Sequence, residues 1–141
     1  MAISTVPPPA RNMTPLETAR AAASARIAAD RWRATSVSER AAAVSQVWAH
    51  LYRRRAELAR VVHSETCKPR IEFEAMEVCP VGLIVKYFAK NARRVLEEAP
   101  AEKPWVMLNK KATVRWVPRG IVGLITPWNF PFLIPFGDAV P

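Results

Sequence analysis

The chain has 141 residues, of which 50% are hydrophobic and 23% are charged, and its formal net charge is +9. This length suits one domain with a modest core, and the composition is that of a soluble globular protein rather than of a disordered one. The two cysteines form no C-x-x-C pair, so they give no sign of a disulfide framework or a thiolate metal site. Two free thiols indicate a reducing, cytoplasmic location.

The basic residues are mostly arginines spread along Ala-rich stretches, and the densest cluster is the triplet at 53–55. Two interpretations stay open: a solvated helical face, or a surface that contacts an anion. A nucleic-acid-binding protein would need a clustered basic face with base-stacking or groove-reading elements. The aromatic residues instead lie on apolar helix faces or beside prolines, so we expect no nucleic-acid partner. His50 and His63 lie far apart without other ligands, so we expect no metal.

Two segments could be mistaken for targeting or membrane sequences. Residues 1–13 are rich in proline and contain no apolar core of a signal peptide, which predicts a disordered leader. Residues 120–137 carry no charge, but prolines interrupt them every four residues. A membrane helix needs a longer and cleaner apolar run. We therefore expect buried protein interior here and no membrane partner.

The middle of the chain has helical periodicity. Thr14 and Ser36 each precede a glutamate by three residues, the capping-box spacing that predicts helix starts, the first helix running to about Trp32. Apolar residues continue at intervals of three and four until Lys68, where the following proline ends the segment. Residues 70–98 repeat the helical period, and Pro80 should kink or split that helix.

The pattern changes after Pro100. Residues 105–108 and 113–117 contain β-branched and aromatic residues and predict two strands joined by a turn. Residues 121–126 form a short apolar run bounded by breakers, which is typical of a strand buried on both faces. The order is helices, then a small β element, then a buried strand that ends in Pro-Trp-Asn. These elements predict the α/β class.

The run from 118 to 131, PRGIVGLITPWNFP, is the most informative part of the sequence. It resembles the motif P-x-G-V-x-G-x-I-x-P-W-N-x-P of the aldehyde dehydrogenase superfamily, which opens the nucleotide-binding sheet of those enzymes. The resemblance extends backwards more weakly through Glu39-Arg40, the run 65–69 (ETCKP) and Glu77-Val78, and covers roughly residues 14–141. The family usually has glycine at the position of Cys67, which puts the local turn geometry in question. Cys67 is no candidate for the catalytic thiol, which in the family lies far downstream.

The resemblance implies an incomplete aldehyde dehydrogenase-like fold. Residues 1–13 would be the leader, and 14–103 the helical part of the cofactor-binding domain. Residues 104–118 would form the β-hairpin of the oligomerisation element, and 119–141 the truncated first strand and turn of the dinucleotide-binding sheet. The full-length protein would be a homo-oligomer. The family's usual amino-terminal strands are missing here or replaced by the leader.

The turn after the strand carries the candidate site. The family's cofactor cleft, which takes NAD or NADP, maps to Ile125, Thr126, Pro127 and Trp128. Asn129 matches the residue whose amide helps hold the oxyanion formed when a cysteine thiolate attacks the aldehyde. An amide suits this task because it donates two N–H bonds and does not titrate. The alternative is a turn asparagine that satisfies local backbone groups.

The resemblance implies an oxidoreductase that converts a small-molecule aldehyde to a carboxylic acid with NAD(P)+. The family's nucleophilic cysteine, general base and phosphate-contacting lysine belong to later sequence, so we expect no activity from this chain alone. Two alternatives from other classes remain: a small basic helical binding protein, and an inactive family remnant that acts as an interaction module.

Overall fold

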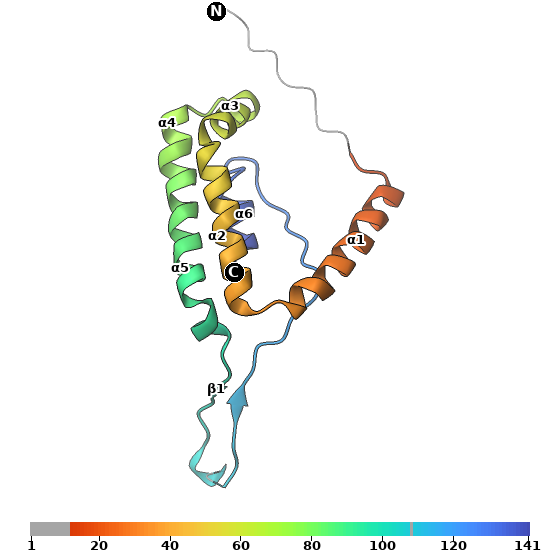
Figure 1. The fold of residues 1–141 in the computed structure, drawn as a ribbon, viewed down its shortest axis with the longest axis vertical. Coiled ribbons are helices and arrows are strands. Elements are labelled where there is room, and N and C mark those ends of the chain that lie inside the picture. The colour runs from red at the N-terminus through yellow and green to blue at the C-terminus, as the bar shows by residue number, and fades with distance from the viewer. Residues whose placement is uncertain (1–11, 108) are drawn as a thin grey trace, which may run out of the picture.

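The computed structural model describes residues 12–107 and 109–141; most of the predicted leader and Leu108 lie outside the described residues. In Figure 1, α2 (Val37–Arg53) and α5 (Cys79–Leu96) run side by side with α6 (Leu133–Ala139) next to them. Helix α1 (Pro15–Ala34) stands away from this group. A narrow arm with a two-stranded sheet projects below the lower end of α5. The described chain is therefore mostly helical with one small sheet.

Both predicted helix starts are confirmed. The Thr14 hydroxyl accepts a hydrogen bond from the Glu17 amide at 3.2 Å, and the Glu17 carboxylate accepts one from the Thr14 amide at 2.8 Å. Ser36 and Glu39 repeat the arrangement at 3.2 and 2.8 Å. Each box satisfies two amides that the first turn would otherwise leave unpaired.

Helix α3 (Arg55–Thr66) ends at Cys67, whose φ of 58° and ψ of 12° lie in the left-handed region. Among the described residues other than glycine, Cys67 alone has a positive φ. Glycine favours this conformation because it has no Cβ. The turn thus keeps the geometry that suits the glycine usual in the family at this position, with cysteine in its place.

A nearly continuous rod follows, made of α4 (Arg70–Phe73), the π-helix η1 (Glu74–Val78) and α5. The irregularity expected at Pro80 takes the form of this π-helical turn rather than a break between helices. A proline ring clashes with the carbonyl four residues earlier, which here belongs to Met76 within η1. The widened turn lies where that clash would occur.

The core is small and centred on the rod. Its fully buried hydrophobic side chains are Phe73 and Val81. Four more hydrophobic residues are nearly fully buried: Ala59, Val62, Val78 and Val85. Helices α2 and α5 meet at Gly82, where a Cβ would lie 2.9 Å from the Trp48 ring. Glycine at this position allows the indole of α2 to rest against the backbone of α5.

The predicted hairpin is only partly confirmed. Strand β1 (Ala99–Pro100) pairs antiparallel with β2 (Thr113–Val114), so the second predicted strand is shorter than 113–117. The strand predicted over 105–108 is wrong for its described residues, because Trp105–Met107 form the 3-10 helix η2. Its turn is closed by a 2.9 Å bond from the Met107 amide to the Pro104 carbonyl.

The buried strand predicted over 121–126 is also not formed. This segment is coil, and Ile125 is fully exposed. A strand requires a neighbouring backbone that accepts and donates the ladder hydrogen bonds. The described residues provide no such neighbour to this segment, since their one sheet consists of β1 and β2. No helix in the described part of the chain is both long and apolar enough to cross a bilayer.

Candidate oxyanion turn

The turn that carries Asn129 is attached to the helical rod by a buried ion pair. Lys68, in the loop after α3, places its Nζ 2.5 Å from Oε1 of Glu77 in η1. The Lys68 side chain is 7% exposed and that of Glu77 is fully buried. Two charges removed from water are stable only when their remaining hydrogen-bonding capacity is satisfied. That requirement is met by the turn itself.

Both partners of the pair bind the turn backbone. The Lys68 ammonium donates to the Asn129 carbonyl at 2.7 Å and lies 4.3 Å from the centre of the Phe130 ring. The second carboxylate oxygen of Glu77 accepts the amides of Phe132 and Leu133 at 2.9 and 3.0 Å. The carboxylate therefore caps the start of α6, which has no side-chain cap of its own.

The Asn129 side chain is exposed and makes no hydrogen bond to any described residue. No described backbone group is a hydrogen-bond partner of this amide, and its assignment to the oxyanion stays a prediction. The main chain of the turn, in contrast, is bound at two places. Lys68 binds the Asn129 carbonyl, and Glu77 binds the backbone amides three and four residues later.

The residues predicted to contact the cofactor lie just before the turn. Ile125 and Trp128 are 102% and 79% exposed, Pro127 is exposed, and Thr126 is partly buried. None of them lines any of four pockets that residues 12–107 and 109–141 form. Neighbouring Gly120 and Gly123 form no cradle, because an added Cβ at either would meet nothing within 4 Å. The cofactor role of these four residues therefore stays a prediction from the motif.

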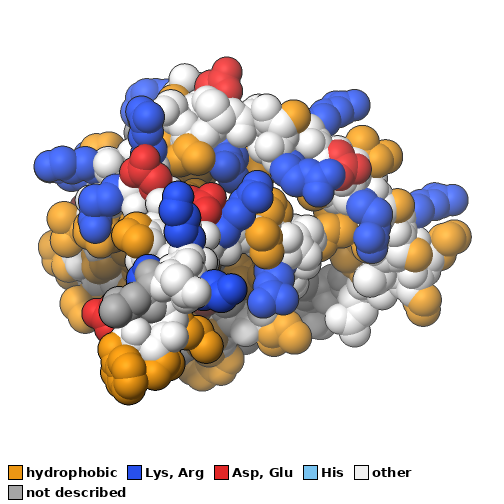
Figure 2. Space-filling model, turned by 90° about the horizontal axis from the view of Figure 1, so that it is seen from below, with side chains coloured by type: hydrophobic (Ala, Val, Ile, Leu, Met, Phe, Trp, Pro, Cys, Tyr) orange, Lys and Arg blue, Asp and Glu red, His pale blue; other side chains and the backbone are white. Residues whose placement is uncertain are grey.

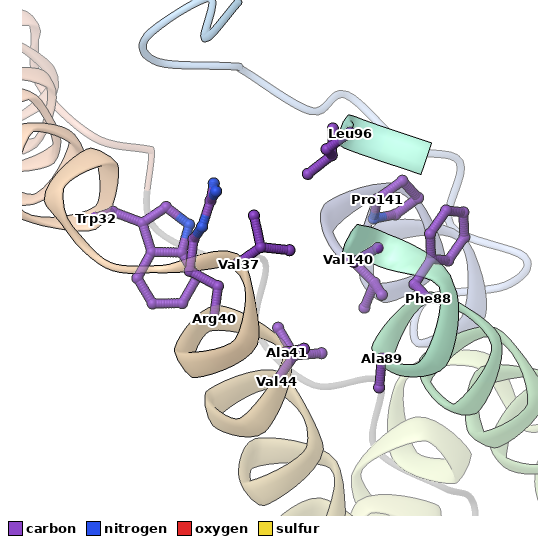
Figure 3. Close-up of a pocket in the computed structure, with 11 residues that line it drawn as sticks. Trp32, Val37, Arg40, Ala41, Val44, Phe88, Ala89, Leu96, Val140 and Pro141 are labelled. Atoms are coloured by element: carbon purple, nitrogen blue, oxygen red, sulfur yellow. The ribbon is translucent and has the colours of Figure 1, made fainter. Parts of the chain in front are cut away.

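A separate apolar pocket lies at the other end of the helices. Figure 3 shows it between the start of α2 and the last turns of α5, with Val140 and Pro141 at its edge and Trp32 and Arg40 on one side. Asn129 does not line it. The Nε atom of Arg40 is buried there without a hydrogen-bond partner among the described residues.

The surface charges follow the dispersed pattern of the sequence. On the face shown in Figure 2, Lys and Arg side chains are scattered between hydrophobic ones rather than gathered in one patch. Among the described residues, some basic side chains are paired with acidic neighbours, as Arg54 is with Glu57 at 2.7 Å and Arg70 with Glu74 at 2.7 Å. Within the described residues, no three His, Cys, Asp or Glu side chains form a group that could hold a metal ion.

In the sequence, Lys68 and Glu77 were noted only as parts of segments that resemble the family, and no role was predicted for them. One signal was present: Phe73, Glu77, Val81 and Val85 follow at four-residue intervals, which places a carboxylate on the buried stripe of the rod. A glutamate in such a position is buried only when it is paired.

The model of the Aldehyde dehydrogenase family matches residues 7–141. The chain belongs to this family. The expectation that the motif at 118–131 indicates an aldehyde dehydrogenase is thereby confirmed.

Curated aldehyde dehydrogenases give the same result. The chain is 35% identical over 117 residues to N-succinylglutamate 5-semialdehyde dehydrogenase of Chromobacterium violaceum, covering 83% of this chain and 23% of that protein. It is 32% identical over 130 residues to glutarate-semialdehyde dehydrogenase of Pseudomonas putida, covering 92% and 25%. It is also 32% identical over 127 residues to a putative NADP+-dependent succinate-semialdehyde dehydrogenase of Mycolicibacterium smegmatis, covering 89% and 24%. The chain thus spans about a quarter of these relatives. No solved structure matches the chain.

Proposed function

We propose that this chain is the amino-terminal segment of an oxidoreductase that oxidises an aldehyde to a carboxylic acid with NAD(P)+. The family match over residues 7–141 supports the general activity, and the share of the relatives that the chain covers supports its being a segment. The relatives' names include three different semialdehydes. We therefore propose an aldehyde substrate without choosing among them.

In the proposed reaction, a cysteine thiolate from another part of the protein adds to the aldehyde carbon, and the carbonyl oxygen takes the negative charge. NAD(P)+ in the cofactor cleft would supply the acceptor for the hydride of that carbon, and water would release the acid from the resulting thioester. The contribution of this chain is the Asn129 amide, which donates a hydrogen bond to the oxyanion. A preorganised donor aimed at charge that develops during reaction is an effective catalytic device.

The observation that supports this role most directly is the contrast between the main chain and the side chain of Asn129. The Asn129 main chain is fixed by Lys68 at 2.7 Å, whereas its side chain is exposed and free of other described groups. A donor that is held in place and not already bonded needs little reorganisation when the oxyanion forms. Ile125, Thr126, Pro127 and Trp128 are proposed to line the cofactor cleft on the strength of the motif.

The test is steady-state kinetics on the complete protein that carries this segment, with succinate semialdehyde and glutarate semialdehyde among the substrates. Asn129→Ala should lower kcat by roughly a hundredfold to a thousandfold, the cost of losing one such donor. It should leave cofactor affinity unchanged, because the turn is expected to meet the cofactor through its backbone. An interaction made mainly in the transition state lowers kcat and kcat/KM together.

Asn109→Ala is the matched control, because Asn109 is also an exposed turn asparagine but lies in the hairpin arm. It should retain wild-type kinetics. A kcat for Asn129→Ala within about threefold of wild type, too small a change for a lost oxyanion donor, would assign Asn129 to the turn and not to the reaction.

A further inference from the structure

The Lys68 ammonium has three N–H donors, and the structure shows a partner for it in three directions. These are the Glu77 carboxylate, the Asn129 carbonyl and the face of the Phe130 ring. The carbonyl partner lies 61 residues away along the chain. The ammonium therefore fixes one end of the turn to the end of α3.

The Glu77 carboxylate fixes the other end. One oxygen faces Lys68, and the other accepts two consecutive amides, those of Phe132 and Leu133. Charge-assisted hydrogen bonds of this kind are stronger than neutral ones. The carboxylate comes from the π-helical turn, 55 residues before Phe132.

Stability alone is a weak reason for this arrangement. Burying two charges is costly, and replacing a buried ion pair by well-packed hydrophobic residues is often neutral or stabilising. Hydrophobic side chains at 68 and 77 would fill the space, but they could not accept amides or donate to a carbonyl. What a hydrophobic pair would lose is the fixed direction of the turn.

We propose that Lys68 and Glu77 are positioning residues for the reaction: together they clamp the 129–133 backbone so that the Asn129 amide points at the oxyanion. This inference rests on the proposed function, because it requires Asn129 to act on the substrate. Neither residue contacts the substrate in this scheme. Their effect is carried through the main chain of the turn.

The experiment separates positioning from stability in the complete protein. Lys68→Met leaves Glu77 buried without its partner, so it should lower both the melting temperature and kcat. The double variant Lys68→Met/Glu77→Leu removes both charges and should recover most of the melting temperature. Its kcat should remain about a hundredfold below wild type, the scale of loss expected when a catalytic group is misplaced by about 1 Å. KM and cofactor affinity should change little.

A matched control uses the neighbouring pair Arg70 and Glu74, whose atoms are 2.7 Å apart at the surface and which does not touch the turn. Arg70→Met/Glu74→Leu should keep wild-type kcat. In an Asn129→Ala background, the Lys68→Met/Glu77→Leu double substitution should cost little further kcat, because it acts through the amide already removed.

The outcomes distinguish the two proposals. If Asn129→Ala is impaired but the stable double variant at 68 and 77 has wild-type kcat, the positioning role is wrong and the proposed function stands. If Asn129→Ala has wild-type kcat, the proposed function fails and this inference fails with it. If kcat recovers in proportion to the melting temperature, the pair is structural only.

A measurement on the wild-type protein covers the case in which no variant folds. The amides of Phe132 and Leu133 should exchange with solvent at least tenfold more slowly than those of exposed turn residues, on the order expected for amides held in stable hydrogen bonds. Exchange of both amides at the rate of an exposed turn would overturn the clamp.

Discussion

Phe73 packs edge-to-face against Phe132, with the ring centroids 5.6 Å apart and the planes at 62°. This contact lies beside the ion pair, because Phe73 precedes Glu77 by one helical turn and Phe132 donates its amide to Glu77. Edge-to-face geometry is favourable for aromatic rings. The polar clamp on the turn thus has a hydrophobic counterpart that involves the same two segments.

Phe73→Ala should destabilise the protein by about 3–5 kcal/mol, because it leaves a cavity at a fully buried position. Chemical denaturation of the complete protein measures this loss. Phe73→Leu, which removes fewer atoms, should cost clearly less. Equal stability of wild type and Phe73→Ala would show that this contact is not part of the folded core.

The left-handed conformation of Cys67 predicts a substitution that stabilises the protein. Cys67→Gly should stabilise the protein by about 1 kcal/mol, because the left-handed conformation costs a residue with a Cβ about 1–2 kcal/mol. The greater freedom of glycine in the unfolded chain offsets part of that gain. Cys67→Ala keeps the Cβ and is the control, so it should not stabilise. Equal melting temperatures for the Gly and Ala variants would contradict a left-handed residue at this position.

The capping box of α2 has a pH signature. Hydrogen bonds from the Ser36 side chain, and then from its backbone amide, hold the pKa of Glu39 below the ordinary value for glutamate. A lowered pKa means that the folded state favours the carboxylate, so this stabilisation is complete above the ordinary glutamate pKa. It is lost as the pH falls through the lowered value.

An NMR titration of the Glu39 carboxyl carbon measures this shift. Ser36→Ala should move the pKa back toward the ordinary value, and the backbone amide that remains should keep the return partial. Ser38→Ala changes an exposed serine in the first turn of the same helix and should leave the Glu39 titration in place. If the titration midpoint of Glu39 is identical in wild type and Ser36→Ala, the Ser36 hydroxyl is not the cause of the lowered pKa.

The sequence predicted those features whose causes are local. The boxes at Thr14 and Ser36 need only residues three positions apart, and both formed as expected. The strand at 121–126 depends on a neighbouring backbone, which its own residues cannot supply, and it did not form. The contacts of Lys68 and Glu77 have a distant cause too: the spacing places Glu77 on a buried stripe, but only the fold shows that residues 129–133 lie against both side chains.

The last prediction concerns the cofactor. The isolated 141-residue chain should bind NAD+ and NADP+ weakly or not at all, because residues 125–128 lie on a largely exposed segment and line none of four pockets that the described part of the chain forms. Ligand pockets in proteins bury most of the ligand's surface, and one side of a cleft cannot do so. A dinucleotide also carries a pyrophosphate, which is usually bound by the amino terminus of a helix. No helix of the described residues begins directly after 128, since α6 starts at Leu133 and its first amides are already bound by Glu77.

Isothermal titration calorimetry of the purified chain with each nucleotide measures this affinity, with the complete protein as the positive control. Micromolar binding by the isolated chain would show that these residues form a cofactor site without the rest of the cleft.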